Sequence, residues 1–112
     1  MSPRLLLSLA LVAAPALAAE GTKQAFSVDL KPGGMHEECV KLAKDESRHY
    51  EWSSNSALDF NIHYHEGSEV FYPLKKDSVA KQKGTFKAKV AQDYCWMWTA
   101  KAPAKLEGML EK

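Results

Sequence analysis

Residues 58–65 read Leu-Asp-Phe-Asn-Ile-His-Tyr-His, in which apolar and polar side chains alternate strictly. Successive side chains of a β-strand point to opposite faces, so this stretch predicts a strand with one buried face and one wet face. Residues 94–98, Tyr-Cys-Trp-Met-Trp, follow the same pattern with larger aromatic side chains. Aromatic rings supply much of the apolar area of a small core. We therefore expect Phe60, Ile62, Phe86, Tyr94, Trp96 and Trp98 to be mostly buried.

Similar alternation recurs along the chain. Further short strands are expected at 26–30, 39–43, 50–52, 70–74, 85–90 and 106–110, separated by turn-forming runs such as Pro32-Gly33-Gly34 and Ser53-Ser54-Asn55-Ser56. Lys75 to Gly84 reads as a polar connection, and 37–44 could instead form a short helix. The pattern predicts an all-β fold, an antiparallel β-sandwich of jelly-roll type with roughly seven or eight short strands.

The first nineteen residues, Met1 to Ala19, have the features of a secretory signal peptide. Arg4 precedes an apolar run that ends in the small residues Ala16-Leu17-Ala18-Ala19. The run is shorter than the roughly 20 residues that span a bilayer, so we expect no membrane span in the mature chain. Residues 20–112 are long enough for one small domain. The brief, alanine-rich signal favours the periplasm as the location, with full secretion as the alternative.

The chain contains two cysteines, Cys39 and Cys95. An even number of cysteines in an exported domain predicts a disulfide between them. The bond would close a loop of about 57 residues, for which the chain-entropy relation gives roughly 4 kcal/mol of stabilisation. Metal ligation by a free thiol pair is the less favoured alternative, because the compartment is oxidising.

Charge and motif content exclude several classes of function. The chain carries 15 Lys and Arg against 14 Asp and Glu, and loss of Arg4 with the signal leaves 14 of each. A nearly neutral chain lacks the basic surface that nucleic-acid binding requires. The sequence holds no nucleophile elbow, no His-Glu-x-x-His and no Gly-rich phosphate loop, so we expect a protein that is not an enzyme.

A histidine pair offers a different chemistry. His63 and His65 lie two residues apart on the polar face of the predicted strand 58–65. Two imidazoles at this spacing can bind one metal ion, and imidazole suits copper and zinc. The pair needs a further ligand, because two do not make a tight site. The candidates are Glu66, Met97, His36 and Met35, the last three lying near the predicted disulfide.

The segment from Cys39 to Ala100 resembles the GOLD (Golgi dynamics) domain family of β-sandwiches. The resemblance rests on Glu38-Cys39, Tyr50-x-Trp52 followed by residues 58–62, Gly84-Thr85-Phe86, and Tyr94 to Trp98. The chain departs from the family in two ways. Cys95 lies two residues nearer to the tyrosine of the closing strand than expected, and Ala100 stands where the family usually has Asn.

This resemblance implies a non-enzymatic module, covering 20–112, that binds a protein or a component of the cell envelope. The alternative is a periplasmic copper- or zinc-binding protein.

Overall fold

The computed structural model describes residues 23–112, so the predicted signal peptide lies outside the described residues. Within that range the chain forms six strands: β1 (Lys23–Leu30), β2 (Met35–Leu42), β3 (Ser47–Glu66), β4 (Glu69–Lys87), β5 (Gln92–Ala100) and β6 (Ala104–Glu111). All pairings are antiparallel. No helix of residues 23–112 combines the length and apolar character needed to cross a membrane.

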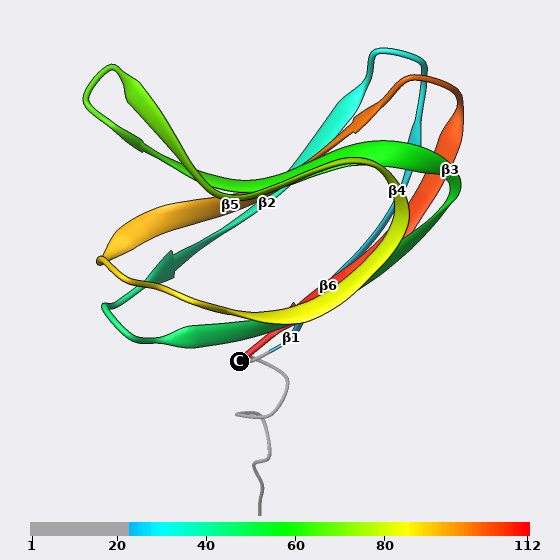
Figure 1. Ribbon diagram of the computed structural model, residues 1–112. Helices are drawn as coiled ribbons and strands as arrows, with labels where there is room; N and C mark the ends of the chain where they lie inside the picture. Colours follow the sequence, from blue (N-terminus) through cyan, green and yellow to red (C-terminus); the bar gives the residue numbers. More distant parts are fainter. Residues whose placement is uncertain (1–22) are drawn as a thin grey trace, which may run out of the picture.

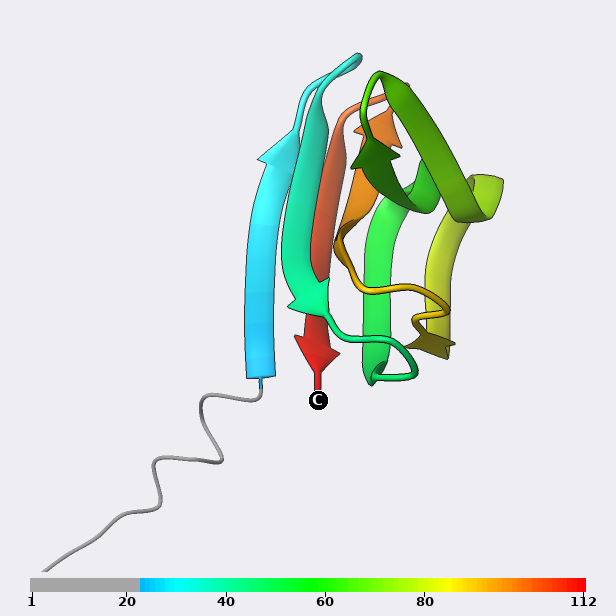
Figure 2. The ribbon, with the colours of Figure 1, turned by 90° about the vertical axis from the view of Figure 1, so that its left-hand side faces the viewer.

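The long hairpin of β3 and β4 organises the sheet (Figure 1). The first half of β3, His49 to Ser54, also pairs with β6, and its second half, Leu58 to His63, pairs with β5. β1 extends the sheet beyond β6, and β2 extends it beyond β5. Because the hairpin bends between its two halves, the sheet curls around an interior (Figure 1). In Figure 2, β1, β2 and β6 run nearly vertically, whereas the green end of the β3–β4 hairpin crosses the view obliquely.

Six strands form where seven or eight were expected, and the bend in β3 accounts for one of the two pairs of expected strands that are joined. The run Ser53 to Ser56 was expected to separate two strands, yet it lies inside β3, at a shift of register between Ser53 and Leu58. Side-chain hydrogen bonds support the irregular backbone here. The Lys105 N–H donates to Asn55 Oδ1 at 2.8 Å, and Ser56 Oγ donates to the Pro103 carbonyl at 2.8 Å. Turn-forming residues therefore bend this strand without ending it.

The expected polar connection from Lys75 to Gly84 was also wrong, because this segment belongs to β4. β4 pairs only with β3 and is therefore an edge strand within the described sheet. Its lysines are exposed, including Lys75, Lys81 and Lys83. Lysines on an edge strand discourage pairing with other chains, so a polar sequence is compatible with a long strand here.

Aromatic side chains fill the interior, as the alternation predicted. Phe60, Ile62, Tyr94, Trp96 and Trp98 are each at most 1% exposed, and Phe86 packs against them half-buried. The Trp98 ring lies 4.8 Å from the Phe26 ring and 5.5 Å from the Phe60 ring, centroid to centroid. The core therefore joins β1, β3 and β5.

The predicted Cys39–Cys95 disulfide is confirmed. Residues 35–42 form a strand, so the helical alternative for 37–44 is wrong. Cys39 and Cys95 are directly opposed in the β2–β5 pair, on the face of the sheet that points away from the core. The bond thus links strands that their own ladder already holds together.

Truncation of Trp96 to alanine should lower the free energy of unfolding by about 3–5 kcal/mol, because the side chain is fully buried and leaves a cavity. Chemical denaturation followed by far-UV circular dichroism measures this change. Met97→Ala is the matched control on the outer face of the same strand, with an expected cost below about 1 kcal/mol. Equal costs for the two variants would contradict the orientation of β5.

Gly108→Ala should lower the free energy of unfolding by about 1–3 kcal/mol, a typical cost of overpacking. A Cβ at this position would lie 2.6 Å from Phe26 Cζ and 2.8 Å from the Glu51 carbonyl oxygen. The comparison is Gly84→Ala, where the nearest atom is the Tyr50 hydroxyl at 2.9 Å, the end of a side chain that can move. Thermal denaturation should rank Gly108→Ala as the more damaging change, and the reverse order would refute this account of the packing.

Candidate functional site

Polar side chains gather around His63 on the outer face of the sheet; we call Glu37, Asn61, His63, His65 and Tyr72 the His63 cluster. His63 Nε2 lies 3.3 Å from Glu37 Oε2, and His63 Nδ1 lies 2.7 Å from Asn61 Oδ1. The ring centroids of His65 and Tyr72 lie 5.2 and 5.8 Å from that of His63. His63 is only 4% exposed, so the expectation that both histidines are wet was wrong for His63 and holds for His65.

Strand register brings the cluster together. His63 on β3 is opposite Cys95 on β5, and Cys95 is opposite Cys39 on β2. The adjacent row runs from Asn61 through Met97 to Glu37. Tyr72 comes from β4, at the shift of register between Ile62 and Tyr64. The imidazole is therefore enclosed by side chains from three strands, and this enclosure buries it together with Asn61 on the outer face.

The hydrogen bond to Asn61 orients the imidazole of His63. An amide oxygen can only accept, so Nδ1 donates to Asn61, and Nε2 faces the carboxylate of Glu37, to which it can donate when the ring is protonated. Burial lowers the pKa of His63 below its ordinary value, the Glu37 charge opposes this, and His65 adds to the lowering. Histidines that bind metals commonly have one ring nitrogen held by an oxygen acceptor in this way, which fixes the direction of the other nitrogen.

Residues 23–112 contain one group of three side chains placed to hold a metal ion: Glu37, His63 and Cys95, whose ligand atoms lie within 4.8 Å of one another. Cys95 is bonded to Cys39, so its sulfur is not a thiolate. Sequence reasoning missed Glu37. The signal was present, since Glu37 lies two residues before Cys39 and therefore shares the outer face with the disulfide.

Of the other predicted ligands, Met97 lies in the row beside the cluster, between Asn61 and Glu37, and the remaining three are dispersed. His36 lies on the core side of β2, where its Nε2 is 2.6 Å from Glu38 Oε2 and its ring is 6.0 Å from that of Trp98. Its expected approach to Met97 was therefore wrong, because the two side chains occupy opposite faces. Met35 is 60% exposed on the outer face, and Glu66 is exposed at the end of β3.

A second candidate site is an aromatic groove between the part of the β3–β4 hairpin near its tip and the other end of β4 with the segment that follows it. We call it the hairpin groove, a pocket of about 510 Å³ lined by Tyr64, Phe71, Tyr72, Pro73, Phe86, Lys87, Lys89, Val90 and Tyr94. The Tyr64 and Phe71 rings stack at 5.1 Å between centroids. Phe71 and Val90 are 37% and 43% exposed. The described lining residues include two lysines and no carboxylate, so the groove is apolar and carries positive charge.

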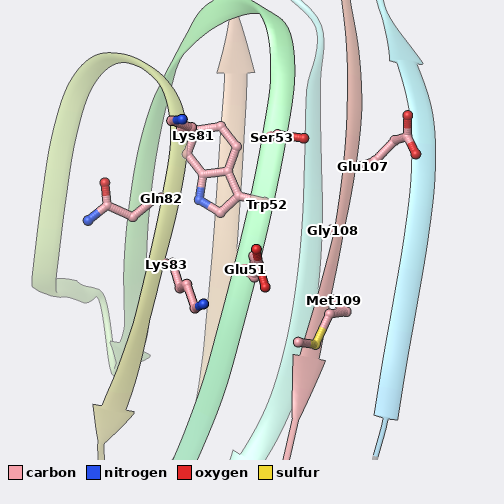
Figure 3. A pocket seen from close by; sticks show the side chains of 9 residues that line it. All are labelled: Glu51, Trp52, Ser53, Lys81, Gln82, Lys83, Glu107, Gly108 and Met109. Atoms are coloured by element: carbon pink, nitrogen blue, oxygen red, sulfur yellow. The ribbon is translucent and has the colours of Figure 1, made fainter.

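A third hollow, of about 650 Å³, lies over the first half of β3 (Figure 3). Lys81 and Lys83 on β4 line one side, and Glu107 and Met109 on β6 line the other. The positive charges of Lys81 and Lys83 are matched in number by the negative charges of Glu51 and Glu107. The hollow therefore presents neither a dominant charge nor a cluster of metal ligands.

Comparison with known proteins supports the fold and gives no function. The sequence matches no protein-family model and none of the curated proteins compared with it. The structure is similar to the crystal structure of the Yersinia pseudotuberculosis-derived mitogen, with a TM-score of 0.50 and 9% identity, over 80% of this chain and 84% of the mitogen chain. A de novo designed double-stranded β-helix aligns over 79% of this chain and 99% of its own, with a TM-score of 0.44 and 14% identity. At such identities the likeness to the mitogen concerns the all-β fold alone.

Stability should decrease as the pH falls below about 6.5, the ordinary pKa of histidine, because the buried His63 has a lowered pKa and the unfolded chain then binds more protons than the folded chain. The decrease should level off below the folded-state pKa. Denaturant titrations at a series of pH values measure it. His63→Gln should flatten this part of the profile, whereas the exposed control His65→Gln, which removes only the smallest of the causes acting on the His63 pKa, should change it less. A profile unchanged by His63→Gln would contradict the burial of a neutral imidazole.

Proposed function

We propose that this protein is an exported, non-enzymatic binding module that recognises an acidic, partly apolar protein segment through the hairpin groove. The observation that carries the proposal is the exposure of Phe71, Tyr72 and Val90 beside lysines at one end of the sheet. Contiguous exposed apolar surface commonly marks an interaction site.

The charge of the groove selects the partner. Lys87 and Lys89 line it, and Lys75 Nζ lies 5.1 Å from the centroid of the Tyr72 ring. An acidic segment would pair with these ammonium groups while its apolar side chains cover the aromatic floor. Aromatic residues at the centre of such patches typically contribute most of the binding energy.

The remaining parts of the proposal rest on the sequence. The signal-like residues 1–19 support export to the periplasm, with secretion as the alternative, and a disulfide is typical of an oxidising compartment. The resemblance to GOLD domains supports a sandwich-type interaction module, and the lack of a catalytic motif supports a non-enzymatic role.

Synthetic peptides of defined composition test this function. A peptide with a central Phe-Leu pair and flanking Asp and Glu should bind, and the same peptide with Lys flanks should not, as measured by isothermal titration calorimetry. Phe71→Ser and the pair Lys87→Glu/Lys89→Glu should each weaken binding at least tenfold. The control Lys81→Glu/Lys83→Glu makes the same charge change on β4 away from the groove and should have little effect. Equal binding of both peptides, or equal effects of both charge reversals, would exclude the hairpin groove as the site.

The His63 cluster favours a second candidate function, the binding of copper or zinc by the oxidised protein. The observation is that Glu37 Oε2 lies 3.3 Å from Nε2 of His63, and that the ring of His65 lies 5.2 Å from the ring of His63, centroid to centroid. Titration with Cu²⁺ and with Zn²⁺ should give weak to moderate binding, which His63→Ala and Glu37→Gln each reduce by at least tenfold. Unchanged affinity in His63→Ala would remove this candidate.

A further inference from the structure

We propose that reduction of the Cys39–Cys95 disulfide by a dithiol converts part of the His63 cluster into a zinc site with Cys39, Cys95, His63 and Glu37 as its ligands. This inference goes beyond both functions proposed above and rests on neither of them. It concerns a reduced form of the protein, in which two thiolates become available next to an imidazole and a carboxylate.

The geometry already brings the four donors together. The ligand atoms of Glu37, His63 and Cys95 lie within 4.8 Å of one another, and the Cys39 sulfur is bonded to that of Cys95. Zinc binds sulfur at about 2.3 Å and nitrogen or oxygen at about 2.0–2.2 Å, so tetrahedral ligands lie roughly 3.3–3.8 Å apart. Small side-chain movements would therefore complete the site once the sulfur–sulfur bond is broken.

The strands do not need the disulfide to stay aligned. β2 and β5 pair continuously from Met35 opposite Thr99 to Leu42 opposite Gln92. The core side of the same two strands is anchored by Leu42, Trp96 and Trp98, which are fully buried. Reduction removes a covalent link on the outer face and leaves the ladder and the core in place, although the loop-closure contribution to stability is lost.

Access and orientation also favour the site. Cys39 and Glu37 are exposed, so a dithiol can reach the bond and a metal ion can enter. Asn61 holds Nδ1 of His63, which leaves Nε2 directed toward the other donors. In the oxidised form the disulfide sulfurs are poor ligands, because metals bind the thiolate. The disulfide therefore keeps the site incomplete until it is reduced.

The chemistry is balanced by the dithiol. Its two thiols transfer two electrons and two protons to the protein disulfide, yielding two protein thiols and the oxidised, cyclic disulfide of the reagent. Zinc then displaces the two thiol protons, which pass to the buffer, and forms two zinc–sulfur bonds. His63 and Glu37 supply the third and fourth ligands without further redox change.

The test compares oxidised protein with protein reduced by dithiothreitol and freed of the reagent by gel filtration without oxygen. Competition with a chromophoric chelator measures the affinity for Zn²⁺, and Co²⁺ substitution reports thiolate ligation through its sulfur-to-metal charge-transfer bands. The reduced protein should bind one Zn²⁺ at least about 100-fold more tightly than the oxidised protein. Both His63→Ala and Glu37→Gln should weaken the reduced site by about tenfold or more.

Matched controls separate this site from the other proposals. His36→Ala and Glu38→Gln remove a His–Glu pair from the opposite face of β2 and should not change the affinity of the reduced protein. His65→Ala should impair any binding by the oxidised protein while leaving the reduced site intact. Equal affinities before and after reduction, no effect of His63→Ala on the reduced protein, or loss of the near-UV circular dichroism signal on reduction would each overturn the proposal.

Discussion

The continuity of β3 is the constraint on which the rest of the structure depends. A single strand pairs with β4 along its length, with β6 in its first half and with β5 in its second half. This is geometrically feasible only because the backbone bends between Ser53 and Leu58, where side-chain hydrogen bonds support the irregular segment. Without this bend, the pairs β1–β6 and β2–β5 would lie along a straight hairpin and could not enclose a common core.

The same strands separate the core from the candidate metal chemistry. On β5 the even-numbered residues Trp96 and Trp98 face the interior, whereas Cys95 lies on the outer face beside His63 of β3. The disulfide and the His63 cluster therefore lie on the outer face of the sheet, away from the aromatic core. The packed aromatic core fixes the register of β2, β3 and β5. The side chains of the His63 cluster on the outer face of these strands are therefore held at fixed positions.

Strand faces could be predicted from the sequence, whereas strand continuity could not. Alternation identified Phe60, Trp96 and Trp98 as core residues, and the cysteine count identified the disulfide. Ser53 to Ser56 indicated the end of a strand because a sequence pattern reports only the preference of neighbouring residues for a turn. The partners that keep β3 continuous lie on β6 and β5, far away in the sequence. The lysines of β4 similarly suggested a loop, because edge strands do not need an apolar face along their whole length.

The candidate site could be predicted only in part, for a related reason. Alternation placed His63 and His65 on one face correctly, but the burial of His63 arises from Glu37 and Tyr72, which approach from β2 and β4. His36 was assigned to the wrong face because it is close to Cys39 in sequence. It lies three residues before Cys39, an odd number, so in a strand the two side chains point to opposite faces. The hairpin groove was missed because Phe71 and Val90 are brought together only by tertiary structure.

Nuclear Overhauser contacts between backbone protons of directly opposed residues test the central claim most directly. If β3 is one bent strand serving two partners, the oxidised protein should show contacts between Trp52 and Gly108 and also between His63 and Cys95, in the same monomeric molecule. The presence of one set without the other, or of either set only between different molecules, would contradict the account.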